Sequence, residues 1–184
     1  MKNLIFVLSA PSGTGKTTIV KKLKDKLKNT EIVTTYTTRK PRKGEKNGVD
    51  YFFVGKDEFE KMVKENKFAE WSIVYGNYYG TPKEEIERIL KNKKNVLLVI
   101  DTQGGLKIKK KYPEAYLIGI LPPSLKEQEN RMRKRGDLSE KEINERLNKS
   151  KEERKILFKH YNYRLINKDI EKTVERIKRI IEKF

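Results

Sequence analysis

The fold of this 184-residue chain is decided by one stretch, Ala10-Pro11-Ser12-Gly13-Thr14-Gly15-Lys16-Thr17. An apolar run over residues 4–8 precedes it, and apolar side chains at helical spacing follow it over residues 17–28. The stretch matches the phosphate-binding pattern Gly-x4-Gly-Lys-Ser/Thr except at its first position, Ala10. Small residues let successive backbone N–H groups converge on a phosphate, and a helix N-terminus favours the same anion. The sequence therefore predicts a strand, a phosphate-binding loop and a helix that together hold a nucleotide.

The chemistry of this loop depends on two of its side chains. Lys16 is expected to reach the β- and γ-phosphates of a nucleoside triphosphate, and the Thr17 hydroxyl is expected to ligate Mg²⁺. Asp101 follows a second apolar run, so it is the candidate acid that holds Mg²⁺ directly or through water. The alternative is that Asp101 caps the next helix. The loop residues expected to bind the triphosphate are Ser12, Gly13, Thr14, Gly15, Lys16, Thr17 and Thr18.

Apolar runs alternate with amphipathic segments along the chain. The runs over residues 4–8, 96–100 and 116–121 are typical of strands buried on both faces of a parallel sheet. The alternation predicts a three-layer α/β fold with a mainly parallel sheet. Residues 37–82 interrupt it and predict a small mixed subdomain. We also expect a strand over residues 32–36, a turn at Gly76-Asn77, a helix after Gly104-Gly105, and a helix with Thr81 as its cap and Pro82 at its first position.

The net charge of +18 requires an anionic partner or a solvated lysine-rich surface. Nucleic acid, an acidic membrane and phosphorylated small molecules all satisfy the charge. Cysteine is absent, which excludes disulfides and thiolate chemistry, and His160 is the single histidine. No apolar run approaches the roughly 18 residues that span a bilayer. We expect a cytoplasmic protein that binds neither a membrane nor nucleic acid.

A second phosphate-binding segment is predicted near residue 40. Arg39 and Arg42 lie three residues apart, stiffened by Pro41, and the planar guanidinium binds phosphate oxygens bidentately. Tyr51 and Tyr79 would add hydroxyl donors. The alternatives for this segment are a solvated basic loop and a nucleic-acid patch.

Taken together, the motifs resemble those of guanylate kinases, in order and over essentially the whole chain. The first motif is Thr37-Thr38-Arg39 with Arg42, Glu45, Gly48, Tyr51 and Phe53. The others are the loop with its Ala10, Gly76-Asn77-Tyr78-Tyr79-Gly80-Thr81, Ile100-Asp101-x-Gln103-Gly104, Leu121-Pro122-Pro123-Ser124 and Ile166-Asn167-x-Asp169.

The resemblance implies a P-loop nucleoside-monophosphate kinase that converts MgATP and GMP to ADP and GDP by direct in-line transfer. It implies one domain over residues 1–184, with a core of residues 1–36, 83–125 and 155–184, a GMP-binding subdomain of residues 37–82 and a helical lid of residues 126–154. The implied catalytic residues are Lys16, Arg39 and the lid residues Arg131, Arg135 and Arg146. The implied GMP-binding residues are Thr35, Arg39, Arg42, Tyr51, Glu70, Tyr79, Thr81 and Asp101. Asn167 is implied to lie near the adenine of ATP.

The chemistry of guanine agrees with the positions that the resemblance assigns to base recognition. A carboxylate at Glu70 accepts hydrogen bonds from guanine N1–H and the 2-amino group, and adenine offers neither donor. A hydroxyl at Thr35 or Thr81 donates to O6, where adenine carries an amino group. A wrong base would leave these groups unpaired.

Two positions depart from the family pattern. Val99 stands where many members carry an acid, so a hydrogen bond that supports the acceptor-site arginines is expected to be missing, and Lys168 replaces another common acid. Three alternatives stay open: a non-catalytic guanylate-kinase-like interaction module, a kinase for another nucleoside monophosphate, and a nucleic-acid-stimulated ATPase. Monomer and homodimer, and GMP and dGMP, are not distinguished by the sequence.

Overall fold

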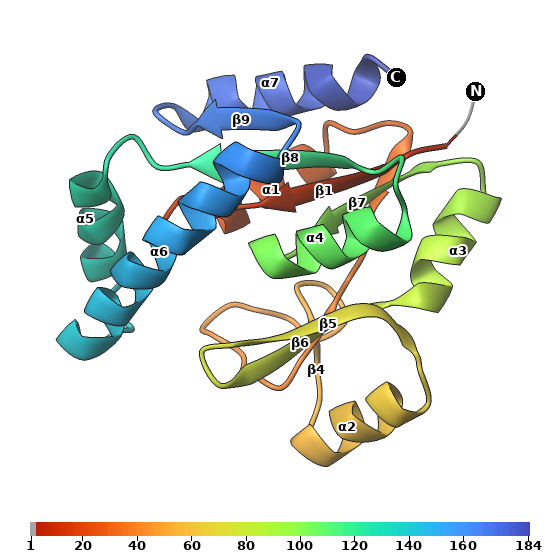
Figure 1. The fold of residues 1–184 in the computed structure, drawn as a ribbon, viewed down its shortest axis with the longest axis horizontal. Coiled ribbons are helices and arrows are strands. Elements are labelled where there is room, and N and C mark those ends of the chain that lie inside the picture. Colours follow the sequence, from red (N-terminus) through yellow and green to blue (C-terminus); the bar gives the residue numbers. More distant parts are fainter. Residues whose placement is uncertain (1–2) are drawn as a thin grey trace.

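The computed structural model describes residues 3–184, and a five-stranded parallel sheet forms its centre (Figure 1). The strand order is β2-β7-β1-β8-β9, and all four neighbouring pairs are parallel. All residues of the central strand are buried, because helices cover both of its faces. The strands are β1 (Ile5–Ser9), β2 (Thr30–Ile32), β7 (Asn95–Val99), β8 (Tyr116–Leu121) and β9 (Tyr163–Ile166).

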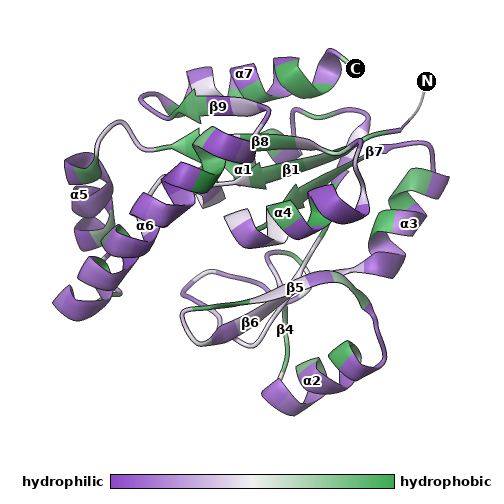
Figure 2. Ribbon diagram, viewed as in Figure 1, coloured by the Kyte–Doolittle hydropathy of each residue, from purple (hydrophilic) through white to green (hydrophobic). Residues whose placement is uncertain are grey.

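Helices cover the two faces of this sheet through two separate apolar clusters. Ile5 and Val7 of β1 belong to the cluster beneath α3 (Lys83–Lys91), α4 (Thr102–Lys111) and α6 (Glu140–His160). Phe6 and Leu8 belong to the cluster beneath α1 (Lys16–Lys24) and α7 (Ile170–Glu182). Figure 2 shows apolar residues concentrated in the central strands and hydrophilic residues over most of α6. The predicted three-layer α/β fold is therefore confirmed.

A separate mixed sheet is formed by residues 36–82 and lies apart from the parallel sheet (Figure 1). Its strand order is β4-β3-β6-β5, in which β3 pairs with β4 in parallel and with β6 in antiparallel fashion. Helix α2 (Lys56–Lys64) packs on it, with the Phe59 and Phe68 rings stacked at 4.6 Å between centroids. The strands are β3 (Tyr36–Thr37), β4 (Phe52–Phe53), β5 (Phe68–Val74) and β6 (Asn77–Pro82).

Helices α5 (Leu125–Arg135) and α6 project together from one end of the parallel sheet (Figure 1). Gly136 ends α5 with a φ of 72°, a left-handed conformation that favours glycine. Ser139 and Glu142 then start α6 with a reciprocal capping box. The chain therefore breaks between α5 and α6 at Gly136.

The strand expected over residues 32–36 is two strands of different sheets. Val33 N–H still donates to Leu97 O of the parallel sheet, whereas Phe52 N–H donates to Thr35 O of the mixed sheet. The chain crosses between the sheets within this single apolar segment, and periodicity alone does not mark the crossing.

The expectation that Thr81 caps a helix is wrong. Residues 77–82 form strand β6, α3 begins at Lys83, and Pro82 is its N-cap without a side-chain hydrogen bond. Gly80 and Pro82 hide this strand in the sequence, but Gly80 is required there. A Cβ on Gly80 would lie 2.8 Å from the Phe68 ring. Helix α4 likewise begins at Thr102, before Gly104-Gly105, because Asp101 caps it.

A buried leucine and an exposed leucine form a matched pair that tests the assigned core. Leu117 of β8 is fully buried, so Leu117→Ala is expected to lower the free energy of unfolding by about 2–5 kcal/mol. Leu125, at the start of α5, is 41% exposed, and Leu125→Ala is expected to change the free energy of unfolding by about 0.5 kcal/mol or less. Urea denaturation measures both values. Similar losses for the two variants would contradict the assigned core.

Candidate functional site

The phosphate-binding loop joins β1 to α1 and has the conformation that its glycines permit. Gly13 and Gly15 have φ values of 77° and 95°. A Cβ on Gly13 would lie 2.8 Å from Met132 Cγ and 2.9 Å from Gln128 O of α5. The glycines therefore allow both the sharp turn and the close packing of α5 against the loop.

Side chains from other elements bind the carbonyl oxygens of this loop. Gln128 Nε2 donates to Ser12 O at 2.6 Å, and Asn167 Nδ2 donates to Thr14 O at 2.8 Å. Arg131 Nη1 also donates to Thr14 O, at 3.2 Å. With these carbonyl oxygens bound, the loop N–H groups other than that of Thr14, which donates to Pro11 O at 3.3 Å, remain available to an anion.

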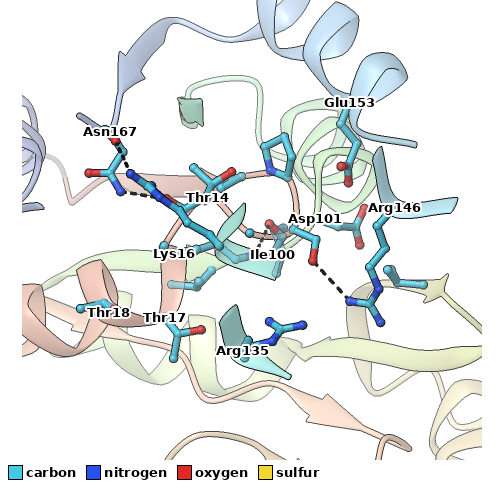
Figure 3. Close-up of a pocket in the computed structure, with 18 of the residues that line it drawn as sticks. Thr14, Lys16, Thr17, Thr18, Ile100, Asp101, Arg135, Arg146, Glu153 and Asn167 are labelled. Atoms are coloured by element: carbon cyan, nitrogen blue, oxygen red, sulfur yellow. Dashed lines mark hydrogen bonds between the residues drawn. The ribbon is translucent and has the colours of Figure 1, made fainter. Parts of the chain in front are cut away.

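Lys16 lies at the base of a cavity of about 900 Å³ (Figure 3). Its Nζ donates to Ile100 O at 3.4 Å. Burial lowers the pKa of Lys16, while the negative charges of Asp101 and Glu153 act to raise it. An anionic phosphate would supply the charge partner that this buried ammonium lacks.

The cavity brings together most of the residues predicted for both nucleotides. It is lined by the loop and by residues of the mixed sheet and of the α5–α6 pair. Arg39 and Thr81 do not line it; each contacts the site through a neighbour. The predicted residues that line it are Ser12, Gly13, Thr14, Gly15, Lys16, Thr17, Thr18, Thr35, Arg42, Tyr51, Glu70, Tyr79, Asp101, Arg131, Arg135, Arg146 and Asn167.

Asp101 caps α4, as its alternative interpretation predicted. Its Oδ1 accepts hydrogen bonds from the N–H groups of Gln103 and Gly104 at 2.8 and 3.1 Å. Its Oδ2 accepts from the Ser72 hydroxyl at 2.5 Å. The carboxylate thus connects the parallel sheet to the mixed sheet at the cavity wall.

Glu70 lines the cavity and carries one carboxylate oxygen that lacks a hydrogen-bond partner within residues 3–184. Its Oε1 accepts a hydrogen bond from the Thr81 hydroxyl at 2.6 Å. Its Oε2 is buried and has no hydrogen-bond partner within residues 3–184. Burial raises the pKa of Glu70 to about 7, and the hydrogen bond from Thr81 opposes that shift. Thr35 also lies buried at the cavity wall.

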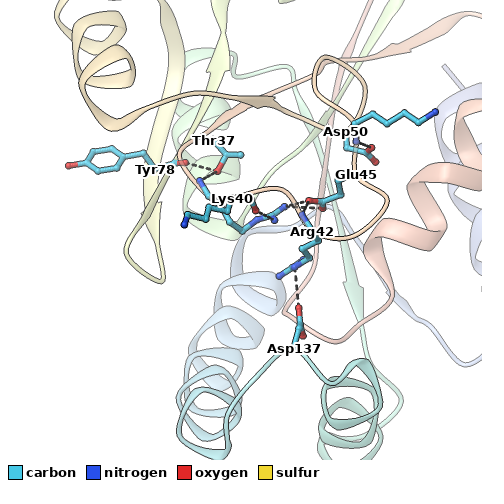
Figure 4. Close-up of polar contacts among 9 residues, drawn as sticks. Thr37, Lys40, Arg42, Glu45, Asp50, Tyr78 and Asp137 are labelled. Atoms are coloured by element: carbon cyan, nitrogen blue, oxygen red, sulfur yellow. Dashed lines mark hydrogen bonds and ion pairs between the residues drawn. The ribbon is translucent and has the colours of Figure 1, made fainter.

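The two predicted phosphate-clamp arginines have different surroundings. Arg39 Nη2 donates to both oxygens of Glu45 at 2.9 Å, and its guanidinium carbon lies 5.4 Å from the centroid of the Tyr51 ring. Arg42 lines the cavity and forms an ion pair with Asp137, 3.2 Å from Nε to Oδ2 (Figure 4). Arg39 is therefore fixed behind the cavity wall, and Arg42 is presented to the cavity.

Asp137 joins the mixed sheet to the α5–α6 pair. Its Oδ1 accepts from Arg135 Nε at 2.6 Å while its Oδ2 pairs with Arg42. Burial acts to raise the pKa of Asp137, but Arg135 and Arg42 hold it below its ordinary value. One carboxylate thus takes the place between two arginines that a phosphate group would suit.

The remaining predicted arginines contact the phosphate-binding loop directly. Arg131 Nη2 donates to Asn167 O at 3.4 Å, in addition to its bond to Thr14. Arg146 Nη1 donates to the Ser12 hydroxyl at 3.3 Å. Asn167 is fully buried, and its side-chain oxygen accepts from Thr173 at 3.1 Å. The amide of Asn167 therefore shapes the loop.

Sequence reasoning missed Glu153, a buried acid of α6 that lines the cavity. Its Oε2 has no hydrogen-bond partner in the described part of the chain, and burial raises its pKa to about 7. The sequence carried a signal: Ile143, Ser150 and Leu157, spaced by seven, mark the buried face of α6, and Glu153 lies on that face. A highly charged helix concealed it.

Residues 3–184 contain no group of three or more histidine, cysteine, aspartate and glutamate side chains arranged to hold a metal ion. Over the same residues, no helix has the length and apolar character that crossing a membrane demands.

Comparison with known proteins gives a consistent result. A model of the family "Guanylate kinase" matches residues 2–184. A guanylate kinase of Caldanaerobacter subterraneus subsp. tengcongensis is 47% identical, with 98% of this chain and 87% of that protein covered. One of Clostridium tetani is 44% identical, with 98% and 86% covered. The crystal structure of guanylate kinase from Anaplasma phagocytophilum superimposes with a TM-score of 0.83 at 34% identity, covering 98% of this chain and 85% of that one.

The fold and the cavity are those of a P-loop phosphotransferase with a second binding region. The chain belongs to the guanylate kinase family. It is a transferase of purine nucleotide metabolism that phosphorylates GMP to GDP with ATP. The predicted family, enzyme class and fold are confirmed, and the alternative functions are not favoured.

The raised pKa of Glu70 predicts that GMP binds more tightly as pH rises. Above its pKa of about 7 the carboxyl group is ionised and is expected to accept from a guanine N–H, whereas below that pH a proton occupies it. One such group gives an affinity gain of about tenfold between about pH 6 and about pH 8. Calorimetric titration of GMP across this range measures the gain.

Glu70→Gln is the matched control, because the GMP phosphate also titrates near a pKa of about 6. Any pH dependence that the variant retains belongs to the phosphate or to other groups such as Glu153. An unchanged pH dependence in the variant would contradict the assignment to Glu70.

Proposed function

We propose that the cavity lined by Lys16 and Glu70 binds ATP and GMP at the same time, with the phosphate-binding loop on the donor side and Glu70 on the acceptor side. The observation that carries this proposal is that one cavity is lined both by Lys16 and by Glu70, whose Oε2 has no hydrogen-bond partner within residues 3–184. A kinase needs its two substrates in contact, because bringing the reacting groups together supplies much of the rate.

On the donor side, the loop N–H groups and Lys16 bind the β- and γ-phosphates of ATP. Thr17 and Asp101 fit Mg²⁺ by the chemistry of their oxygen donors, with Asp101 acting through water because its own oxygens cap α4 and accept from Ser72. Mg²⁺ typically takes few protein ligands and keeps waters and phosphate oxygens, so such a sparse donor set suits it. When bound, it neutralises charge on the β- and γ-phosphates.

On the acceptor side, Glu70 recognises the guanine base and the basic cluster recognises its phosphate. Glu70 Oε2 accepts from a guanine N–H, while Thr81 fixes the carboxylate plane through Oε1. Arg42 binds the GMP phosphate with the hydroxyls of Tyr51 and Tyr79, after exchanging Asp137 for that phosphate. Arg39 supports Tyr51 from behind.

Between the two nucleotides, arginine side chains stabilise the charge of the transferring phosphoryl group. Arg131 and Arg146 already contact the loop, and Arg135 reaches the cavity beside Arg42. Transfer is direct and in line, since the acceptor is already an anionic phosphate oxygen and needs no nucleophilic side chain. Exclusion of water by the surrounding protein limits hydrolysis of ATP.

The proposed binding roles correspond to three parts of the chain. We propose residues 37–82 as the GMP-binding subdomain, residues 126–154 as the lid, and the remaining residues as the core. The mixed sheet and the paired helices α5 and α6 support these limits. The substrates are nucleotides of the cytoplasm, where we propose that the enzyme acts, with dGMP as a second acceptor. We propose no nucleic-acid partner. The arginines whose positions indicate a function lie at the nucleotide site, so the positive charge is explained without nucleic acid.

A panel of acceptors tests this function. With ATP and Mg²⁺, coupled detection of ADP is expected to show turnover with GMP well above that with AMP, CMP or UMP, and dGMP is expected to be used. No more turnover with GMP than with AMP would overturn the proposal.

A variant pair separates the two sides of the cavity. Glu70→Gln loses the charged acceptor and is expected to raise the KM for GMP about 10- to 100-fold while the binding of ATP is unchanged, because hydrogen bonds to charged groups contribute about 1.5–3 kcal/mol. Lys16→Ala is expected to weaken ATP binding and to reduce kcat. Steady-state kinetics and ATP titration measure both, and equal loss of GMP use and ATP binding in Glu70→Gln would assign Glu70 a structural role.

A further inference from the structure

The turn between β5 and β6 holds a bulky residue in a conformation that favours smaller ones. Tyr75 and Gly76 have φ values of 50° and 75°. Val74 pairs with Asn77, so these two residues form the whole connection. Two-residue connections with positive φ at both positions prefer Asn-Gly, whereas a bulky side chain in this region is an outlier. Tyr75 therefore occupies its position against the preference of its own backbone.

Such strain persists where the surrounding contacts maintain it, and here they come from α6. The Arg146 guanidinium carbon lies 4.4 Å from the centroid of the Tyr75 ring, and Lys149 Nζ lies 4.6 Å from it. Arg146 and Lys149 are three residues apart, so they lie on one face of the helix. The ring thus joins the hairpin of the mixed sheet to the lid helix.

The contact determines where a functional guanidinium lies. Arg146 lines the cavity and donates to the Ser12 hydroxyl of the phosphate-binding loop (Figure 3). Its Nε is buried and has no hydrogen-bond partner within residues 3–184, so a stacked ring and one terminal nitrogen hold the group. The Tyr75 hydroxyl also lacks a partner over those residues, so Tyr75 contacts Arg146 through its ring.

We infer that Tyr75 is a positioning residue for phosphoryl transfer: its ring face holds the guanidinium of Arg146 in the cavity, where Arg146 meets the transferring group. The inference rests on the role proposed above for Arg146. A guanidinium is planar and weakly hydrated, so it stacks well on an aromatic face. Because Tyr75 follows β5, the strand that carries Glu70, the stacking also links the sheet that recognises guanine to the arginine that serves the reaction.

Three substitutions separate the ring from the turn. Tyr75→Phe keeps the ring and is expected to keep kcat. Tyr75→Leu retains a bulky side chain at positive φ but lacks the aromatic face, and Tyr75→Asn gives the turn its preferred residue and also lacks the face. Both are expected to lower kcat about 2- to 30-fold with the KM values for ATP and GMP unchanged within about twofold. Thermal unfolding checks that each variant is folded. Tyr75→Asn serves here as the variant whose turn carries the residue preferred at positive φ.

The decisive measurement is a double-mutant cycle with Arg146→Ala. If Tyr75 acts through Arg146, Tyr75→Asn slows the natural enzyme but has no further effect in the Arg146→Ala background. Additive losses, or a Tyr75→Phe variant as slow as Tyr75→Asn, would overturn the inference. Normal kcat in Arg146→Ala alone would instead refute the proposed role of Arg146.

A structural readout tests the positioning independently of activity. The aromatic ring is expected to shift the side-chain proton resonances of Arg146 upfield in the natural protein and in Tyr75→Phe. The shift is expected to disappear in Tyr75→Leu and Tyr75→Asn. Equal resonances in all four proteins would show that the ring does not hold the guanidinium.

Discussion

The site depends on how the carbonyl groups of the phosphate-binding loop are satisfied. A short loop can present its N–H groups to an anion only if its carbonyl oxygens have other partners. Here Gln128 of α5, Arg131 of α5 and Asn167 after β9 bind the oxygens of Ser12 and Thr14. The three donors come from regions more than a hundred residues away in sequence, so the loop conformation exists only in the folded chain. This network also explains why α5 lies so close to Gly13.

Carboxylates balance the charge of the arginines that line the cavity or lie behind its wall. Glu45 holds Arg39, Asp137 lies between Arg42 and Arg135, and Glu127 contacts Arg131. Like charges gathered without such partners would repel one another and lower the stability of the unliganded protein. These ion pairs thereby fix the orientation of the arginine side chains. The net charge of +18 is a property of the composition and does not say where the charges lie. The ion pairs show where individual arginines are held.

Part of this architecture could be read from the sequence because it is encoded locally. The loop motif, the apolar runs of β1, β7 and β8, and the break at Gly136 depend on residue type and spacing over a few positions. Strand β6 escaped detection because Gly80 and Pro82 disfavour strands, and the packing of Phe68 against Gly80 overrides that preference. The sequence allowed Asp101 to cap a helix or to hold a metal ion, and only the hydrogen bonds from Gln103, Gly104 and Ser72 show that it caps α4.

By itself, the sequence determined the class of fold and the phosphate-binding loop, and it predicted candidate residues for binding a phosphate and a guanine, because each follows from a motif of contiguous or closely spaced residues. The tertiary structure alone decided which of these groups face the cavity and which support it from behind. Arg39 stands behind Tyr51, Asn167 shapes the loop, Glu153 lies buried against the cavity, and Tyr75 stacks on Arg146. Burial and stacking are properties of surfaces brought together from distant parts of the chain, and no local pattern specifies them.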